Sequence, residues 1–259
     1  MSMEYFSGIS DAMRITFVQV MILSVIAIGI FLYGMYLNIK KWGLGTTGYA
    51  QEPGGGGITV FPKTFASQVA KKGDWKIILK TLVLDIILQR RIIRISKFRW
   101  FMHISIFVGW MTLFLLSLLM FLIELLSLSG VNIHPEAIRQ MLQPWNDLFS
   151  YILLLGIGIA IFRRLFVKRA RESTISYDAV LLAGLTFIVI TGFVAQGIRI
   201  GDFWAFGIDW GINAAPQMAL FHAVVSLLFC IAYIPFSKYI HMIATPLTIL
   251  ANIEAEEGE

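Results

Sequence analysis

The chain has 259 residues, of which 58% are hydrophobic and only 14% are charged, and its mean hydropathy is +0.77. Soluble domains carry about 25% charged residues, so this composition excludes an ordinary soluble domain. The net charge of +5 does not indicate nucleic-acid binding, because its distribution along the chain follows membrane topology, as described below.

Five apolar blocks approach or exceed the ~20 residues that a helix needs to cross hydrocarbon. They cover residues 15–37, 100–123, 145–162, 179–198 and 216–236. The third is the weakest, because Asp147 lies near its start. We predict an all-α integral membrane protein, a five-transmembrane-helix bundle that forms one domain over residues 1–259 and crosses the cell membrane several times.

The N-terminal region shows no sign of a cleaved signal peptide. Its polar stretch contains Glu4, Asp11 and Arg14, and the apolar block that follows is too long for a signal-peptide core. The one cysteine, Cys230, lies inside the fifth block, where a lone cysteine usually packs as a small hydrophobe. No disulfide and no four-cysteine cluster site can form within this chain.

The basic residues are strongly asymmetric. Residues 40–99 contain 12 Lys and Arg, residues 163–171 contain 5, and Lys238 follows the fifth block. The remaining three, on the other side of the predicted membrane, are Arg14, Arg139 and Arg199. Cytoplasmic loops carry the excess of Lys and Arg, so we predict that the N-terminus lies outside and the C-terminus in the cytoplasm.

The longest predicted cytoplasmic link covers residues 38–99. It contains a glycine-rich stretch at residues 53–57, followed by apolar residues at three- and four-residue steps that predict an amphipathic helix at about residues 75–94. Two roles are compatible for this helix: anchoring to anionic lipid, or docking of a cytoplasmic subunit. Residues 253–259 read as a solvated acidic tail.

Two shorter links are predicted outside. Residues 127–143 contain His134-Pro135-Glu136, a plausible helix start. Residues 199–215 carry Trp204 and Trp210, which suit the membrane interface.

The histidines carry the chemistry that the sequence suggests. His103 and His222 lie inside predicted spans, and His241 lies just past the fifth. Ionisable residues inside a membrane indicate a functional site by default. The structural alternative for any one of them is a neutral histidine hydrogen-bonded between helices.

Depth distinguishes the three histidines. His222 and His241 are 19 residues apart, or about 28 Å along one helix, which places His241 at the inner boundary. His103 lies at a similar inner depth on the second helix, so His103 and His241 can ligate one haem iron from opposite faces of the porphyrin. Arg99 and Lys238 are near enough to meet haem propionates, or are simply topological charges.

His222 has no comparable partner. At matching outer depth the second block offers Leu113, Leu116 and Met120, and methionine in an apolar helix is far more often packing than a ligand. His134 in the outer link is the other candidate. A haem held by His222 alone would keep one open face.

Several segments resemble a known family. Residues 221–222 and 235–242, with the element Pro-Phe-Ser-Lys-x-x-His, resemble the last helix of the nitrate reductase gamma-subunit family, the dihaem cytochrome b anchors. Residues 88–103 are more similar to the cytochrome b subunits of heterodisulfide reductases. Residues 5–8 and the whole layout resemble the cytochrome b family, the E subunits, of the membrane-bound heterodisulfide reductases of methane-producing archaea.

The resemblance implies ligands by position. His103 and His241 match the ligands of the inner haem, and His222 matches the fifth-helix ligand of the outer haem. The gamma-subunit pattern has a second histidine ten residues after the first on the second helix. That position here is Leu113, a departure that bears on the ligation of the outer haem.

The resemblance also implies a function. Reduced methanophenazine would be oxidised at this protein, and haem b would pass its electrons to a cytoplasmic iron–sulfur subunit that reduces the coenzyme M–coenzyme B heterodisulfide. The disulfide-reducing site must lie on that partner, because this chain lacks the cysteines. Four polar residues near the outer side are candidates for the carrier site, each as easily structural: Glu124, Gln196, Arg199 and Gln217.

Two rival functions remain open. One is a quinol-oxidising cytochrome b anchor of another sulfur-linked or nitrate-type reductase, although Leu113 and residues 88–103 argue against the nitrate type. The other is a haem-free membrane anchor or a small transporter. Transporters show internal repeats and broken helices, whereas five predicted spans do not divide into halves.

Overall fold

The computed structural model describes residues 11–44, 57–71, 75–211 and 214–252. All regular elements within these ranges are helical. Residues 5–8, most of the glycine-rich stretch and the acidic tail lie outside the described residues.

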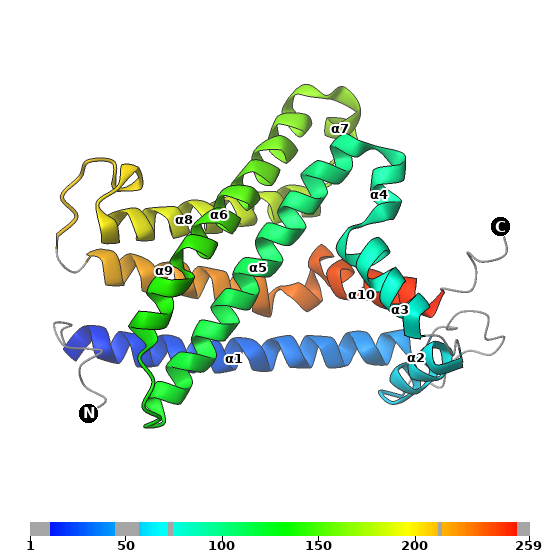
Figure 1. Cartoon of the computed structure of the whole chain (residues 1–259), viewed down its shortest axis with the longest axis horizontal. Helices are drawn as coiled ribbons and strands as arrows, with labels where there is room; N and C mark the ends of the chain where they lie inside the picture. Colours follow the sequence, from blue (N-terminus) through cyan, green and yellow to red (C-terminus); the bar gives the residue numbers. More distant parts are fainter. Residues whose placement is uncertain (1–10, 45–56, 72–74, 212–213, 253–259) are drawn as a thin grey trace. The chain divides into compact units, whose positions relative to one another are not determined.

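Within the described ranges, five helices are long and apolar enough to cross a membrane, which confirms the predicted number of spanning helices. They are α1 (Asp11–Trp42), α5 (Lys97–Leu128), α6 (Pro135–Phe166), α8 (Ser176–Ile200) and α9 (Ala214–Leu227), the last continued by the π-helical turn η4 (Leu228–Ala232) (Figure 1). Most side chains on these helices are partly or fully exposed, as expected of surfaces that face lipid.

The chain forms two compact units. The first comprises Met1–Ile22 and Phe98–Val225, and the second comprises Leu23–Lys97 and Ser226–Glu259. The first unit therefore contains α5, α6 and α8, and the second contains the long link and the C-terminal elements. The single-domain organisation stays a prediction.

The helix α6 extends beyond the predicted third block at both ends. It begins at Pro135, which confirms the helix start predicted at His134-Pro135-Glu136. The Asp147 side chain, which weakened the prediction, accepts a hydrogen bond of 2.7 Å from Gln196 Nε2 of α8. A buried polar group costs free energy unless it is hydrogen-bonded, so this bond between helices lets a carboxylate remain in an apolar span.

Glycines bring α5 and α6 into close contact. A Cβ atom on Gly109 would lie 2.8 to 2.9 Å from atoms of Leu153, and one on Gly156 would lie 2.8 Å from Ile106 Cγ1 and 2.9 Å from its backbone nitrogen. Small residues let transmembrane helices approach backbone to backbone. The contact at Gly156 is made with Ile106 of α5, three residues after His103.

This close approach makes a stability prediction. Replacing Gly156 by alanine should force α5 and α6 apart and lower the free energy of unfolding by about 1–3 kcal/mol, the usual cost of overpacking. Gly158→Ala in the same helix is the matched control, because a Cβ there meets nothing within 4 Å. It should be neutral or slightly stabilising. Thermal melting of both variants in detergent checks this; equal melting temperatures would contradict the close contact.

The end of the fifth span differs from its prediction. The predicted block ran to Phe236, but the helical ladder ends at Ala232, and two 3₁₀ turns, η5 (Ile234–Phe236) and η6 (Lys238–Ile240), follow. Pro235 lacks an amide hydrogen and its ring clashes with the preceding turn. The interrupted chain means that the predicted rise of about 28 Å from His222 to His241 does not apply.

The segment after the fifth span packs on α1 within the second unit. A Cβ on Gly34 would lie 2.5 Å from Pro235 Cβ, so only glycine allows this approach. Asn38 Nδ2 donates to the carbonyl oxygen of Pro235 over 2.9 Å. This bond satisfies a carbonyl beside the helix break and helps to place the turns that precede His241.

The long link contains more structure than predicted. The amphipathic helix expected at 75–94 is interrupted: it consists of α3 (Trp75–Thr81), the π-helical turn η2 (Leu82–Ile87) and α4 (Arg90–Ile95). The helices α2 (Val60–Lys71) and α10 (His241–Ala251) were not predicted. In the second unit, α10 packs against α2, α3 and η2.

Asp85 explains the interruption. The periodicity placed it on the polar face of one helix, but its side chain is only 2% exposed and pairs with Arg90 Nε at 2.9 Å. Arg90 Nη2 donates to the second carboxylate oxygen over 3.2 Å. The helix is interrupted at Gln89, which adopts a left-handed conformation with φ of 52°, and Arg90 directly after it pairs with Asp85.

Candidate functional site

His222 is the predicted ligand whose surroundings the structure defines best. It lies on α9, and its Nδ1 is 3.0 Å from the hydroxyl oxygen of Thr191 on α8. Thr191 is itself only 5% exposed. Its hydroxyl donates to the backbone carbonyl of Ile188 over 3.0 Å. All of these atoms belong to the first unit.

These two hydrogen bonds select the tautomer of His222. A hydroxyl has one hydrogen to donate, and Thr191 directs it at Ile188. The Thr191 oxygen therefore accepts from His222, which places the imidazole hydrogen on Nδ1. Nε2 keeps its lone pair, the state in which a neutral histidine ligates a metal.

Gly192 provides the surface on which the ring rests. A Cβ atom at this position would lie 3.1 Å from His222 Cε1 and 3.5 Å from Nε2. The imidazole thus packs against the backbone of α8. Thr191 thus fixes the tautomer of the ring, and Thr191 and Gly192 together fix its orientation.

Two aromatic side chains of α8, Phe187 and Phe193, pack against aromatic rings from other elements. The rings of Phe187 and Phe221 meet edge to face with centroids 6.2 Å apart. Further along, the Phe193 ring lies 4.8 Å from that of Tyr151 and stacks on that of Trp204 at 4.6 Å. The predicted interfacial Trp204 is therefore also part of the packing of the first unit.

The four candidates for the carrier site fall into two groups. Glu124 is buried and pairs with Arg139 Nη2 at 2.5 Å, and Gln196 bonds Asp147 as described above. Arg199 and Gln217 are exposed. Glu124 and Gln196 therefore connect neighbouring helices. Their partners Arg139 and Asp147 were not predicted from the sequence.

His241 is the first residue of α10 in the second unit and is exposed. Its Nδ1 forms a short hydrogen bond with the carbonyl oxygen of Lys238. A carbonyl only accepts, so Nδ1 is the donor in this bond. The neighbouring Tyr239 is 3% exposed, and burial raises the pKa of its phenol, which therefore stays neutral.

The remaining predicted residues lie as follows. His103 is half-buried on α5 of the first unit, and Leu113 is half-buried further along the same helix. His134 precedes α6 and is exposed. Arg99 and Lys238, the proposed propionate partners, are both exposed. Because His103 and His241 belong to different units, their pairing on one iron stays a prediction.

The predicted ligands can be compared with the requirements of a metal ion and of haem. Within the described residues no three His, Cys, Asp or Glu side chains come together as an ion site. A haem iron takes four ligands from the porphyrin and needs only one or two from the protein. Single histidines, such as those predicted as ligands at 222 and 241, are compatible with that requirement.

The family model and the similar proteins found by comparison name the same subunit. The family model for the E subunit of dihydromethanophenazine:CoB–CoM heterodisulfide reductase matches residues 79–249. The protein of that name from Methanosarcina mazei is 56% identical over 257 residues, covering 96% of this chain and 98% of its own length. That of Methanosarcina acetivorans is 55% identical over 258 residues, covering 96% and 97%. No solved structure matches.

Proposed function

Because the chain belongs to the family of heterodisulfide reductase E subunits, we propose that it is the membrane subunit of a dihydromethanophenazine:heterodisulfide oxidoreductase. It oxidises dihydromethanophenazine in the cell membrane and delivers the electrons to a cytoplasmic iron–sulfur subunit. That partner reduces the CoM–CoB heterodisulfide. The carrier and the disulfide come from the names of the relatives, and the membrane role is supported by the five apolar helices.

The reaction balances across the two subunits. The reduced carrier gives up two electrons and two protons, and the heterodisulfide takes up two of each and becomes two thiols. This chain contains one cysteine, Cys230, so it cannot itself hold a four-cysteine cluster. The division of the reaction between subunits follows from that count.

We further propose that the chain binds haem b. His103 and His241 hold the inner haem, a pairing that rests on their depth in the sequence, and His222 holds the outer one. When bound, haem b accepts single electrons and so connects a two-electron carrier to one-electron clusters. The observation that carries the proposal is the bond from His222 to Thr191, which leaves Nε2 as a ligand inside an apolar span.

Residues of α8 orient the His222 ring and provide the surface against which it packs. A ligating histidine normally donates its other ring N–H to a second group, which fixes the ring and raises its basicity. Thr191 provides this acceptor, and Gly192 leaves room for the ring against α8. Neither residue is charged, so the surroundings stay apolar.

The proposed orientation can be measured on α6. Cysteines replacing Glu136 and Lys168, in a Cys230→Ser background, lie beyond opposite ends of the apolar part of α6, and the native side chains are 55% and 81% exposed. With the N-terminus outside, an impermeant maleimide added to intact cells should label position 136 and not 168. The reverse pattern would invert the assignment of the inner and outer sites.

A redox titration of the purified complex tests the function. A reduced water-soluble phenazine should bleach and shift the Soret band of the protein, and adding CoM–CoB heterodisulfide should reverse the change. A preparation without a Soret band would favour a haem-free anchor. A band that is reduced by phenazine but not reoxidised by the heterodisulfide would favour a cytochrome b of another complex.

A further inference from the structure

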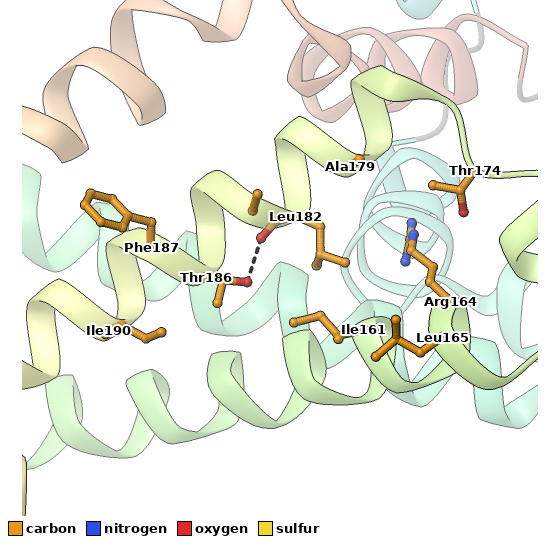
Figure 2. Close-up of a pocket in the computed structure, with 10 residues that line it drawn as sticks. Ile161, Arg164, Leu165, Thr174, Ala179, Leu182, Thr186, Phe187 and Ile190 are labelled. Atoms are coloured by element: carbon orange, nitrogen blue, oxygen red, sulfur yellow. Dashed lines mark hydrogen bonds between the residues drawn. The ribbon is translucent and has the colours of Figure 1, made fainter.

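An apolar groove runs along the first unit between the C-terminal half of α6 and the N-terminal half of α8. Its volume is about 540 Å³, within the roughly 300–1,000 Å³ typical of small-molecule sites. Figure 2 shows the side chains that line it, most of them apolar. The apolar lining includes Ile161, Leu165, Leu182, Ala183, Phe187 and Ile190.

One end of the groove is cationic. Arg164 is the one charged residue in its lining, and in Figure 2 its guanidinium lies toward Thr174 at the end where the chain enters α8. Arg164 Nη1 donates to the carbonyl oxygen of Ala160 over 3.3 Å. Its Nε is buried, and no acceptor reaches it from the described part of the chain.

Further positive charge surrounds this end. Arg163 lies within electrostatic reach of both Arg99 and Arg164. The nearby acids have other partners: Glu172 is 3.9 Å from Lys168, and Asp178 accepts from the backbone of Ile175 over 3.4 Å. The described residues provide no carboxylate to pair with Arg163 or Arg164. The adjacent cations Arg163 and Arg164, with the unmet N–H donor of Arg164, indicate an anionic ligand.

We propose that this groove binds an anionic membrane phospholipid, with its phosphate on Arg164 and one of its hydrocarbon chains along the apolar lining. Arginine is suited to phosphate because its planar fork can donate two parallel hydrogen bonds. The groove ends near the link between α6 and α8. Because α6 and α8 are candidate membrane spans, that link should lie at the membrane boundary, where lipid phosphates are found.

Charge decides between this ligand and the lipid-soluble carrier. A phenazine with a hydrocarbon tail fits an apolar groove but offers no negative charge to Arg164 and its neighbours. A free phosphate offers the charge but leaves the apolar lining unfilled. Only an anionic lipid matches both halves of the site, and this inference stands whether or not the chain carries haem.

Native mass spectrometry of the delipidated complex tests the site. The probe is dioleoyl phosphatidylglycerol in neutral detergent, with dioleoyl phosphatidylcholine for comparison. Arg164→Gln should weaken binding of the most tightly held phosphatidylglycerol by about tenfold or more, as expected from losing a charge-assisted hydrogen bond. Arg169→Gln removes the same charge from an exposed position of the same link and should leave that affinity unchanged.

A second pair of variants tests the apolar half independently. Ala183→Leu fills the groove and should also lower the phosphatidylglycerol affinity, whereas Ala219→Leu on the exposed surface of α9 should not. Equal binding by wild type and Arg164→Gln would overturn the proposal, as would equal affinity for the two lipids. Displacement of phosphatidylglycerol by inorganic phosphate would also reject it, and displacement by a phenazine with an isoprenoid tail would assign the groove to the carrier.

Discussion

Replacing His103 or His241 by alanine is expected to remove one of the two proposed haems and to stop electron delivery to the partner subunit. The reason is that two axial ligands hold one iron, so losing either one destroys the same low-spin site. The expected measurement is a pyridine haemochrome assay on the purified complex, together with the low-spin signal in electron paramagnetic resonance. Heterodisulfide reduction driven by reduced phenazine should fall to background.

The double variant His103→Ala/His241→Ala makes the test specific. If the two histidines share one haem, the double variant should lose no more haem than either single variant. Gln140→Ala is the control, because Gln140 is exposed on α6 and is not a candidate ligand, so this variant should retain full haem content. Additive loss in the double variant would mean that His103 and His241 hold different haems, and the shared inner site would be wrong.

The spans were predictable because their signal is strong and local. A membrane helix needs only length and apolar composition, and each of the five apolar blocks overlaps one candidate span of the structure, although the fifth block extends past Ala232. Even Asp147, which weakened the third block, is compatible with a span once Gln196 bonds it. That bond joins residues 49 positions apart, and no local pattern predicts such a partner.

The interruptions were not predictable in detail. A periodic apolar pattern at residues 75–94 indicates one amphipathic helix, but the buried pair of Asp85 with Arg90 accompanies a left-handed break at Gln89. Pro235 lies inside an otherwise apolar run, and the break it causes depends on Gly34 of α1 for its packing. In both cases the conformation depends on tertiary contacts of the folded state, which override local propensity.

The histidines of the candidate site could be found from the sequence, since ionisable residues in apolar spans stand out. Thr191 and Gly192 could not, because a threonine and a glycine are ordinary residues of membrane helices. Their role appears only when α8 is placed beside His222. The general requirement that a ligating histidine has a second partner would have predicted an acceptor, without identifying it.

The outer site is expected to bind carbon monoxide. In the proposal His222 provides one ligand, and the position at which the gamma-subunit pattern has a second histidine is Leu113 here, whose side chain cannot ligate iron. An iron with one protein ligand is open to small gases, while a bis-histidine iron is not. The dithionite-reduced complex should therefore show a carbon monoxide difference spectrum for one of the two proposed haems, and His222→Ala should abolish that spectrum.

Two further variants separate ligation from positioning at the outer site. Leu113→His offers the missing ligand and should convert the outer haem to low spin, with loss of carbon monoxide binding. Thr191→Val removes the acceptor of the His222 Nδ1–H while keeping side-chain volume, so haem should remain but its midpoint potential should shift. Thr191→Ser retains the acceptor and should restore the wild-type potential. One haem per chain in the wild type would reject the outer site, and an unchanged potential in Thr191→Val would leave His222 as a ligand but remove Thr191 from its support.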